Sequence, residues 1–264
     1  MKERLGEVVG SIVASKIDET EKRYSIFDSL LDGRRNGIRV IAELKPASPS
    51  QGNLSTSNFD VENIATAYTD GGASALSVLV EPMYFGGSYE LIQQIRNIID
   101  VPILAKGFIF KPIHVAHCST VRADAFLLMV RVVEEAGANL QLLLDIGRSL
   151  GMEAVVEAAS SSEVRTAISA GAKILQINSR NIYGDLSIDL LNIREARNLP
   201  EDVVLIAASG ISKPDDMKQV FALSENRVDA VLVGTSLMKS ADPTTSVREL
   251  VEAGQAIVQN QGGR

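Results

Sequence analysis

The stretch Gly72-Ala73-Ser74-Ala75-Leu76-Ser77-Val78-Leu79 joins a small-residue turn directly to an apolar run of the length and type expected for a buried strand. Similar phrases, each following an amphipathic helical stretch, recur at 122–129, 171–178 and 228–234. Between these phrases fall further apolar runs bounded by turn residues: Ile38–Leu44, Val101–Ala105, Glu153–Val156 and Val203–Ala207. The four phrases and four runs together predict eight strands that alternate with helices.

Strands this apolar, separated by helices, are typical of a parallel sheet covered on both faces. Eight such units predict an α/β fold, a single (β/α)₈ TIM barrel, with an open doubly wound sheet as the alternative. Residues 1–36 precede the first strand and are expected to form a short helical N-terminal extension, because they are too few for a core of their own. The barrel is expected to occupy residues 37–264, giving one domain overall.

Helix boundaries are visible in the same pattern. Pro214 follows Ser212-Lys213 and Pro243 follows Asp242, which places a proline in the first turn of two predicted helices. A third helix is predicted over Glu134–Leu150, with Gly151 as its C-terminal stop.

Composition and charge exclude several classes of protein. The 264 residues are 45% hydrophobic and carry a formal net charge of −7, so no diffuse basic surface is available for nucleic acid. Cys118 is the only cysteine, and His114 and His117 share one helical stretch, so we expect no disulfide and no metal site, with Cys118 packed inward. No apolar run is long enough to span a membrane, and we expect a soluble cytoplasmic protein without a membrane partner.

Charged residues close several of the predicted strands. In a barrel, the active site lies at the C-terminal ends of the strands. Glu43 and Lys45 share one face of the first strand, while Lys106, Glu157 and Asn178 each end another. Two lysines and two carboxylates are thus expected at one mouth, where burial and neighbouring charges tune pKa values for acid–base work. Structural ion pairs are the alternative, although burying four charges for stability alone is a poor design.

Two glycine-containing turns follow the last two strands. They are Ala208-Ser209-Gly210-Ile211-Ser212 and Gly234-Thr235-Ser236. Backbone N–H groups in such turns can hold a phosphate, and barrel enzymes frequently bind phosphate at this place, whereas simple tight turns are the alternative. Candidates to line an apolar pocket for an aromatic ring, if they are not ordinary core, are Tyr84, Phe85, Phe108, Leu127 and Met129.

From about Ile38 to Met238 the chain resembles the indole-3-glycerol-phosphate synthase family. The motifs that carry the resemblance are, in order, Ile41-Ala42-Glu43-Leu44-Lys45-Pro46-Ala47-Ser48-Pro49-Ser50, Leu76-Ser77-Val78-Leu79-Val80-Glu81-Pro82, Phe85-Gly86-Gly87-Ser88, Lys106-Gly107-Phe108-Ile109, Val156-Glu157, Ile177-Asn178-Ser179-Arg180, Ala208-Ser209-Gly210-Ile211 and Val233-Gly234-Thr235-Ser236-Leu237-Met238. The resemblance implies ring closure of a carboxyphenylamino deoxyribulose 5-phosphate with loss of carbon dioxide and water, in tryptophan biosynthesis. It implies no metal or organic cofactor, a phosphorylated small molecule as the ligand, and other enzymes of that pathway as conceivable partners.

The resemblance also implies a role for each matching residue. Lys106 resembles the principal general acid and Glu157 the base that assists dehydration. The remaining roles are orientation by Glu43, anion binding and shared acid duty by Lys45, hydrogen bonds from Asn178, positioning by Ser209, phosphate binding by Gly210, Gly234 and Thr235, and closure over the substrate by Ser48.

The chain departs from the family pattern at two positions. Many members carry glutamate where this chain has Ala208, and aspartate where it has Gly107. Loss of that aspartate is expected to lower the pKa of Lys106, other things being equal. Two other functions stay open: a Schiff-base enzyme that uses Lys106 or Lys45, and a barrel that binds a phosphorylated ligand without turnover.

Overall fold

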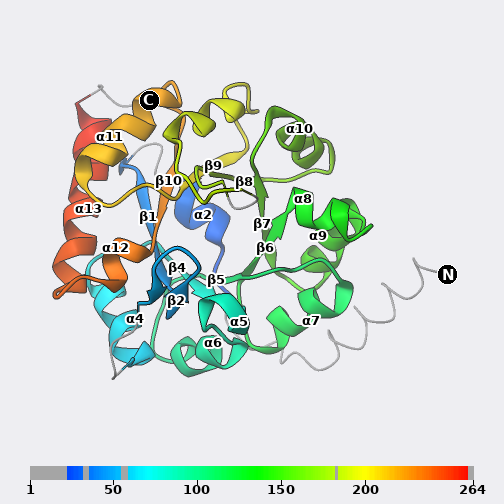
Figure 1. The fold of residues 1–264 in the computed structure, drawn as a ribbon, viewed down its shortest axis with the longest axis horizontal. Coiled ribbons are helices and arrows are strands. Elements are labelled where there is room, and N and C mark those ends of the chain that lie inside the picture. Colours follow the sequence, from blue (N-terminus) through cyan, green and yellow to red (C-terminus); the bar gives the residue numbers. More distant parts are fainter. Residues whose placement is uncertain (1–22, 32–35, 55–58, 182–183, 261–264) are drawn as a thin grey trace.

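The computed structural model describes residues 23–31, 36–54, 59–181 and 184–260, and its centre is a closed barrel of parallel strands (Figure 1). The order around the ring is β1-β10-β9-β8-β7-β6-β5-β4, and β4 pairs with β1 to close it. The strands of the barrel are β1 (Arg39–Leu44), β4 (Ala75–Leu79), β5 (Ile103–Lys106), β6 (Ala125–Met129), β7 (Glu153–Ala158), β8 (Ile174–Asn178), β9 (Val204–Ala208) and β10 (Ala230–Val233). The closed ring confirms the predicted TIM barrel and excludes the open sheet.

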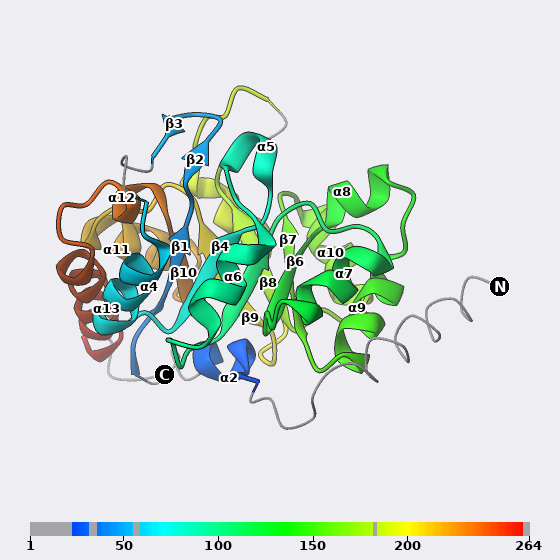
Figure 2. The same cartoon turned by 90° about the horizontal axis from the view of Figure 1, so that it is seen from below.

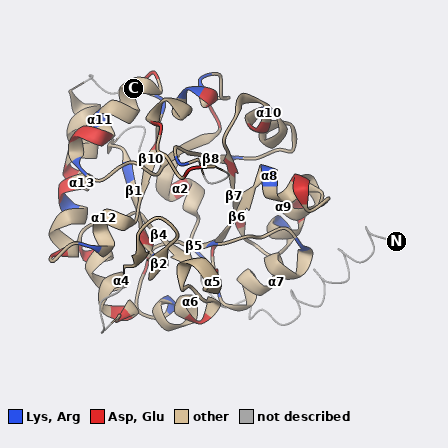
Figure 3. Ribbon diagram, in the orientation of Figure 1, with Lys and Arg blue, Asp and Glu red and all other residues tan. Residues whose placement is uncertain are grey.

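Helices surround the ring of strands, as the alternation of the sequence predicts (Figure 2). They are α4 (Val61–Asp70), α5 (Pro82–Phe85), α6 (Tyr89–Arg96), α7 (Pro112–Thr120), α8 (Val130–Glu135), α9 (Leu140–Ser149), α10 (Ser161–Ser169), the 3-10 helix η1 (Leu190–Ala196), α11 (Pro214–Leu223), α12 (Thr235–Met238) and α13 (Pro243–Gln259). Outer helices such as α13 carry both acidic and basic residues (Figure 3).

Two of the predicted helix starts are confirmed and one predicted helix is wrong. Helices α11 and α13 begin at Pro214 and Pro243, and the Asp242 side chain accepts a hydrogen bond from the Thr245 N–H. The single helix predicted over residues 134–150 is two helices, α8 and α9. Gly137 takes a left-handed φ of 62°, and the Asn139 side chain caps the start of α9, so the chain reverses between them.

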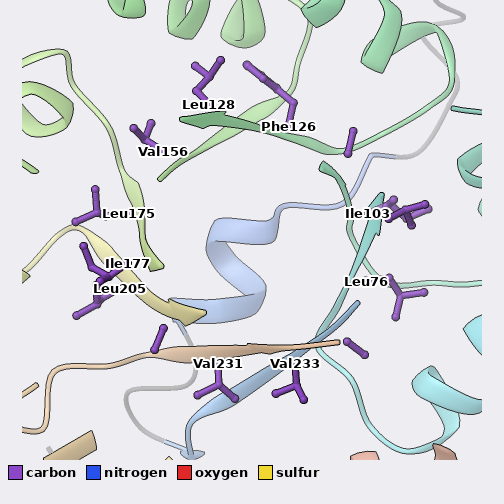
Figure 4. Close-up of a cluster of buried hydrophobic side chains, with 14 of the residues drawn as sticks. Leu76, Ile103, Phe126, Leu128, Val156, Leu175, Ile177, Leu205, Val231 and Val233 are labelled. Atoms are coloured by element: carbon purple, nitrogen blue, oxygen red, sulfur yellow. The ribbon is translucent and has the colours of Figure 1, made fainter. Parts of the chain in front are cut away.

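The strands separate two apolar clusters. Outward side chains such as Leu76, Phe126 and Leu175 point away from the barrel axis toward the helices (Figure 4). Inward side chains such as Ile41, Leu104 and Val155 fill the barrel. This alternation follows from the period of two along each strand, and it places Glu43, two residues after Ile41, on the inside of the ring.

The end of the barrel where the strands begin is closed by helix α2 (Ile26–Leu31), which lies opposite the loops that carry the site (Figure 2). Ile26 and Leu30 are fully buried within the inward cluster. The carboxylate of Glu153, at the start of β7, accepts hydrogen bonds from the Ser25 hydroxyl and the Phe27 N–H. Helix α2 lies in the predicted helical extension; residues 1–22 and 32–35 of that extension lie outside the described residues.

The opposite end is open and carries a short hairpin. Strands β2 (Ala47–Ser48) and β3 (Gly52–Asn53) pair antiparallel directly after β1. Within the described part of the chain, no helix combines the length and the apolar character needed to cross a membrane.

Candidate active site

A cavity of about 620 Å³ opens at the C-terminal ends of the barrel strands. All of the site residues predicted from the sequence line it: Lys106, Glu157, Glu43, Lys45, Asn178, Ser209, Gly210, Gly234, Thr235, Ser48, Phe85, Phe108, Leu127 and Met129. The structure therefore brings the two predicted groups, the charged residues and the glycine turns, to one chamber.

Four inward-facing residues form the ring at the floor of this cavity. Glu43, Lys106, Glu157 and Ala208 come from β1, β5, β7 and β9, which are alternate strands of the barrel. Alternate strands supply the side chains of one layer in a TIM barrel. This layer holds two carboxylates and an ammonium, and Ala208 adds only a methyl group.

Glu43 joins the two lysines. Its Oε1 lies 2.8 Å from the Lys45 Nζ and its Oε2 lies 2.7 Å from the Lys106 Nζ. Burial alone would raise the pKa of Glu43, but the two ammoniums outweigh burial and lower this pKa to about 2. Glu43 is therefore ionised at neutral pH and holds both lysines in fixed positions.

Lys106 stays charged although it is buried. Removal from water lowers the pKa of an ammonium, but the carboxylates of Glu43 and Glu157 outweigh this effect and raise the pKa of Lys106 above its ordinary value. The absence of aspartate at Gly107 is predicted to give Lys106 a lower pKa than in relatives that carry aspartate there, and this stays a prediction. Within this chain, two other carboxylates supply the negative charge near the ammonium.

For Glu157, burial has a larger effect on the pKa than the neighbouring groups have. Burial raises the pKa of its carboxyl group, and this effect exceeds the lowering by Lys106 and by hydrogen bonds from Asn178 and Gln176. The Asn178 Nδ2 lies 3.3 Å from the Glu157 Oε1, and the Gln176 Nε2 donates to the Oε2. A carboxylate with a raised pKa beside a charged ammonium is a suitable base and acid pair.

Two turns form the side of the cavity opposite the apolar wall. Ser209 and Gly210 both take left-handed φ values, 68° and 79°, so the chain turns sharply where β9 ends. Gly234 and Thr235 form the start of α12. The hydroxyl oxygens of Ser48 and Ser236 are buried and lack a hydrogen-bond partner among the described residues, so both are available to an anion there.

The apolar wall comes from strand β6, helix α5 and the loop after β5. Leu127 and Met129 lie on the inner face of β6 and are nearly buried, whereas 43% of Phe108 is exposed at the rim. Phe85 ends α5 and lines the same wall, together with Tyr84.

Comparisons with known proteins identify one family for most of the chain. A family model described as indole-3-glycerol phosphate synthase matches residues 3–250. The indole-3-glycerol phosphate synthase of Mycobacterium sp. (strain KMS) is 40% identical over 249 residues, covering 94% of this chain and 89% of the relative. That of Endomicrobium trichonymphae is 39% identical over 231 residues, covering 87% of this chain and 86% of the relative.

The chain belongs to the indole-3-glycerol phosphate synthase family. Solved structures of lower identity share the fold alone. A structure described as native KDPGal has a TM-score of 0.60 and 18% identity, covering 83% of this chain and 96% of that chain. A thiamine phosphate pyrophosphorylase from Pyrococcus furiosus has the same TM-score and identity, covering 85% and 98%.

Two glycines of the family motifs have clear steric reasons in this chain. A Cβ atom on Gly234 would lie 2.5 Å from the Glu43 Oε1, so a side chain there would displace the carboxylate that holds both lysines. A Cβ atom on Gly107 would lie 2.8 Å from the Cγ2 of Val80. The position where many family members carry aspartate is therefore filled here by the Val80 side chain.

Two cations without a predicted role also line the cavity: Arg180, which lies within a family motif, and Lys239, which directly follows one. Arg180 lines the cavity, its backbone N–H donates to the Asn178 Oδ1 at 3.0 Å, and its guanidinium donates to the Leu186 carbonyl. Lys239 lines the cavity from the end of α12 and donates to the Gln51 side chain of the β2–β3 hairpin. Arg180 could have been predicted as a site residue, because it lies just beyond the end of a predicted strand. Lys239 lies farther from a strand end, and its sequence position does not indicate a place in the site.

The two histidines contact aromatic rings, and the cysteine is buried. His117 stacks on the Tyr89 ring at 3.9 Å between centroids, and His114 meets the edge of the Phe110 ring. Cys118 is buried, as predicted. Over the described residues, no group of three or more His, Cys, Asp or Glu side chains is arranged to hold a metal ion.

Proposed function

We propose that this chain is an indole-3-glycerol-phosphate synthase that converts 1-(2-carboxyphenylamino)-1-deoxyribulose 5-phosphate to indole-3-glycerol phosphate, a carboxy-lyase reaction of tryptophan biosynthesis. The observation that carries the proposal is the position of Lys106. Its ammonium is held by Glu43 and faces Glu157 at the floor of a cavity with an apolar wall and two glycine turns. Membership of the family supports the same reaction.

In the first step, the ring carbon that bears the carboxylate attacks the ketone carbon of the sugar chain. Lys106 donates a proton to the ketone oxygen as that carbon–carbon bond forms. Carbon dioxide then leaves, and the electrons of the broken bond restore the aromatic ring. A well-placed general acid contributes about 10²–10⁴-fold to such a step, and Lys106 meets the requirement because Glu43 and Glu157 keep it charged.

In the second step, water is removed to complete the indole. Glu157 takes a proton from the methylene carbon next to nitrogen, while the former ketone oxygen leaves as water after accepting a proton from Lys45. Glu157 then passes this proton to Lys45, which restores the ammonium. Lys106 recovers from solvent the proton that it gave to the ketone oxygen. The whole reaction therefore consumes one proton from solvent, as loss of carbon dioxide from a carboxylate requires.

The remaining groups position the substrate. The backbone N–H groups of the turns at Ser209–Gly210 and Gly234–Thr235 bind the phosphate, with Ser48 closing over it. The benzene ring lies against Phe85, Phe108, Leu127 and Met129, and Asn178 binds a sugar hydroxyl. With the phosphate and the ring bound in this way, we expect the reacting carbons to lie above the layer of Glu43, Lys106 and Glu157, which lines the same cavity.

The charged state of Lys106 argues against Schiff-base chemistry, because only a neutral amine attacks a carbonyl. Its carboxylate neighbours raise the pKa of Lys106, which keeps the free amine scarce at neutral pH. Borohydride added with substrate is therefore expected to leave the protein mass unchanged. A stable adduct on Lys106 or Lys45 would support the imine reaction instead.

The proposal is tested by following indole fluorescence after the protein is mixed with the carboxyphenylamino deoxyribulose phosphate. Wild type is expected to produce a rising signal. Lys106→Ala is expected to lose most of it, and the control Lys173→Ala, whose side chain is largely exposed on the surface, is expected to match wild type. Substrate binding without fluorescence in wild type would overturn the proposal in favour of a binding protein.

A further inference from the structure

The layer of the barrel directly beneath Glu43, Lys106 and Glu157 contains a buried amide. The alternate strands β4, β6, β8 and β10 contribute one inward residue each to this layer, which consists of Ser77, Leu127, Gln176 and Leu232. Gln176 is 0% exposed, and its Nε2 donates to the Glu157 Oε2. Its Oε1 is buried and has no hydrogen-bond partner among the described residues.

A buried amide with one unpartnered oxygen lowers the free energy of unfolding relative to an apolar side chain of similar volume. Leu127 and Leu232 show that the same layer accepts aliphatic side chains. Packing alone therefore gives no reason for an amide at Gln176. Its one hydrogen bond to another side chain among the described residues goes to the proposed base.

The two oxygens of Glu157 are in different surroundings. Asn178, which contacts Oε1 at a long 3.3 Å, lines the cavity, whereas Gln176, which contacts Oε2, lies below the cavity floor. Oε1 thus faces the substrate chamber and Oε2 faces the barrel interior. A carboxylate held through one oxygen presents the other in a fixed direction.

On the basis of the proposed function, we propose that Gln176 is a positioning residue which holds Glu157 through Oε2 and thereby makes Oε1 the oxygen that accepts the substrate proton. The hydrogen bond also favours the ionised form of Glu157, which is the form a base requires. With only a methyl group at Ala208, the fourth place of the catalytic layer offers no second carboxylate, so the reaction depends on the orientation of this one.

Other charged groups either act on Glu157 electrostatically or line a cavity that reaches it, as Asp189 before η1 does, and all of them remain when Gln176 is replaced. Lys106 of β5 lowers its pKa and Glu43 of β1 raises it. Arg131 of α8, Glu163 of α10 and Arg180 after β8 line a neighbouring polar cavity of about 360 Å³ that also reaches Glu157. Since none of these groups changes in a Gln176 variant, a shifted pH profile reports the loss of the amide.

The test is the dependence on pH of the dehydration rate for Gln176→Met, measured by indole fluorescence in single turnovers, because Glu157 acts after carbon dioxide has left. Methionine keeps the volume and removes the donor. We expect the pKa of Glu157 to rise, because the ionised form loses a hydrogen bond. The acidic limb of the profile, where activity falls as pH falls, should therefore move to higher pH by about one unit or more. Above that limb kcat is expected to fall further than KM changes, because the base is less well oriented.

Ser77→Ala is the matched control. The Ser77 hydroxyl lies in the same layer, is equally buried and is also unpartnered, but it makes no hydrogen bond to Glu157 among the described contacts. We expect this variant to keep the wild-type pH profile. Ser77→Ala is expected to unfold at the wild-type temperature or slightly above it, because it removes an unpartnered buried oxygen. Gln176→Met also removes the hydrogen bond to the buried Glu157 carboxylate, so it is expected to unfold at a somewhat lower temperature.

The outcomes separate the inference from the proposed function. An inactive wild type overturns the function, whereas an active wild type with the same acidic limb in Gln176→Met overturns only the role of Gln176. Gln176→Leu repeats the measurement if the methionine variant does not fold. Failure of both variants to fold, while Ser77→Ala folds, would show that the amide is structural and would also overturn the inference.

Discussion

Buried ion pairs lie at both ends of the barrel, and they differ in what else holds them. At the end closed by α2, Arg96 donates to Asp124 at 2.6 Å and also to the carbonyls of Ile99 and Val101. The Asp124 carboxylate accepts two backbone N–H groups as well, from Tyr24 and Ile103. Apart from the contact between the two side chains, these hydrogen bonds all go to backbone groups, and Arg23 adds a further positive charge near Asp124. This pair is therefore held mainly by the chain itself.

At the open end, the partners of Glu43 are side chains. Its two oxygens contact the ammoniums of Lys45 and Lys106, and both lysines line the cavity. A substrate anion can take over these ammoniums, but nothing can enter between Asp124 and the backbone. A buried charge held by backbone groups therefore stabilises the scaffold, whereas a buried charge held by side chains at a cavity is available for chemistry.

The largest expected effect comes from Lys106→Met. This change removes the proposed acid and leaves Glu43 paired with Lys45, so activity should fall by about 10²–10⁴-fold while the fold is retained. The measurements are the rate of indole fluorescence and the thermal unfolding midpoint. A large drop in the unfolding midpoint would mean that Lys106 supports the fold as Arg96 does, which would contradict the difference between the two ends.

The matching change at the closed end is Arg96→Met. It leaves Asp124 buried without its cation, which typically costs about 3–5 kcal/mol. Urea unfolding should show that loss, while kcat per folded molecule stays at the wild-type value. A normal free energy of unfolding combined with a reduced kcat would mean that this ion pair serves the reaction and not the scaffold.

A smaller effect is expected from pH, and Glu43→Gln isolates it. In the folded protein the pKa of Glu43 is lowered from 4.5 to about 2, so its ionisation stabilises the fold above pH 4.5 and this contribution is lost as pH falls toward 2. The free energy difference between wild type and variant should therefore shrink by up to about 3 kcal/mol over that window. Urea unfolding at several pH values measures it, and a constant difference would contradict the assigned cause.

Most of the fold and the floor of the site follow from sequence because they depend on local periodicity. The period of two along each strand places Glu43 and Lys45 on one face, and the rule that strand ends carry the site selects Lys106, Glu157 and Asn178. These inferences need no knowledge of which strands are neighbours. All of these residues line the cavity as predicted.

Features that depend on ring closure are not visible in the sequence. Gly234 lies against Glu43 because β10 pairs with β1, which joins two ends of the chain. Helix α2 shows an apolar face, but its sequence does not say which end of the barrel that face covers. Gln176 looks like an exception in an apolar strand until its contact with Glu157 is known.

The break between α8 and α9 is a different case, because its signals were present. Gly137 has the left-handed conformation typical of a helix end, and Asn139 is a strong N-cap residue. The predicted helix ran through them because the apolar periodicity continues on both sides. Periodicity identifies a buried face, and it says less about whether one helix or two provide it.

Two glycines at the open end of the barrel are expected to respond differently to a methyl group, one through activity and the other through stability. Gly234→Ala should push the Glu43 carboxylate aside, since the new Cβ would lie 2.5 Å from its Oε1, and kcat should fall with little change in stability. Gly107→Ala meets the packed Val80 side chain instead and should lower the free energy of unfolding by about 1–3 kcal/mol, as overpacking does. Equal effects of both changes on kcat would argue against the role of Glu43 in holding the lysines.

The smallest expected effect comes from Ala208→Glu. The new carboxylate would enter the one place of the catalytic layer that now carries a methyl group, on the strand next to Asn178. A second carboxylate near Glu157 raises its pKa by repulsion, but it also offers another proton acceptor during dehydration. These effects oppose each other, so we expect less than a tenfold change in kcat and an upward shift of the acidic limb. Single-turnover fluorescence separates the two: a faster dehydration phase would show that Ala208 limits the rate, and an unchanged phase would show that Glu157 alone suffices.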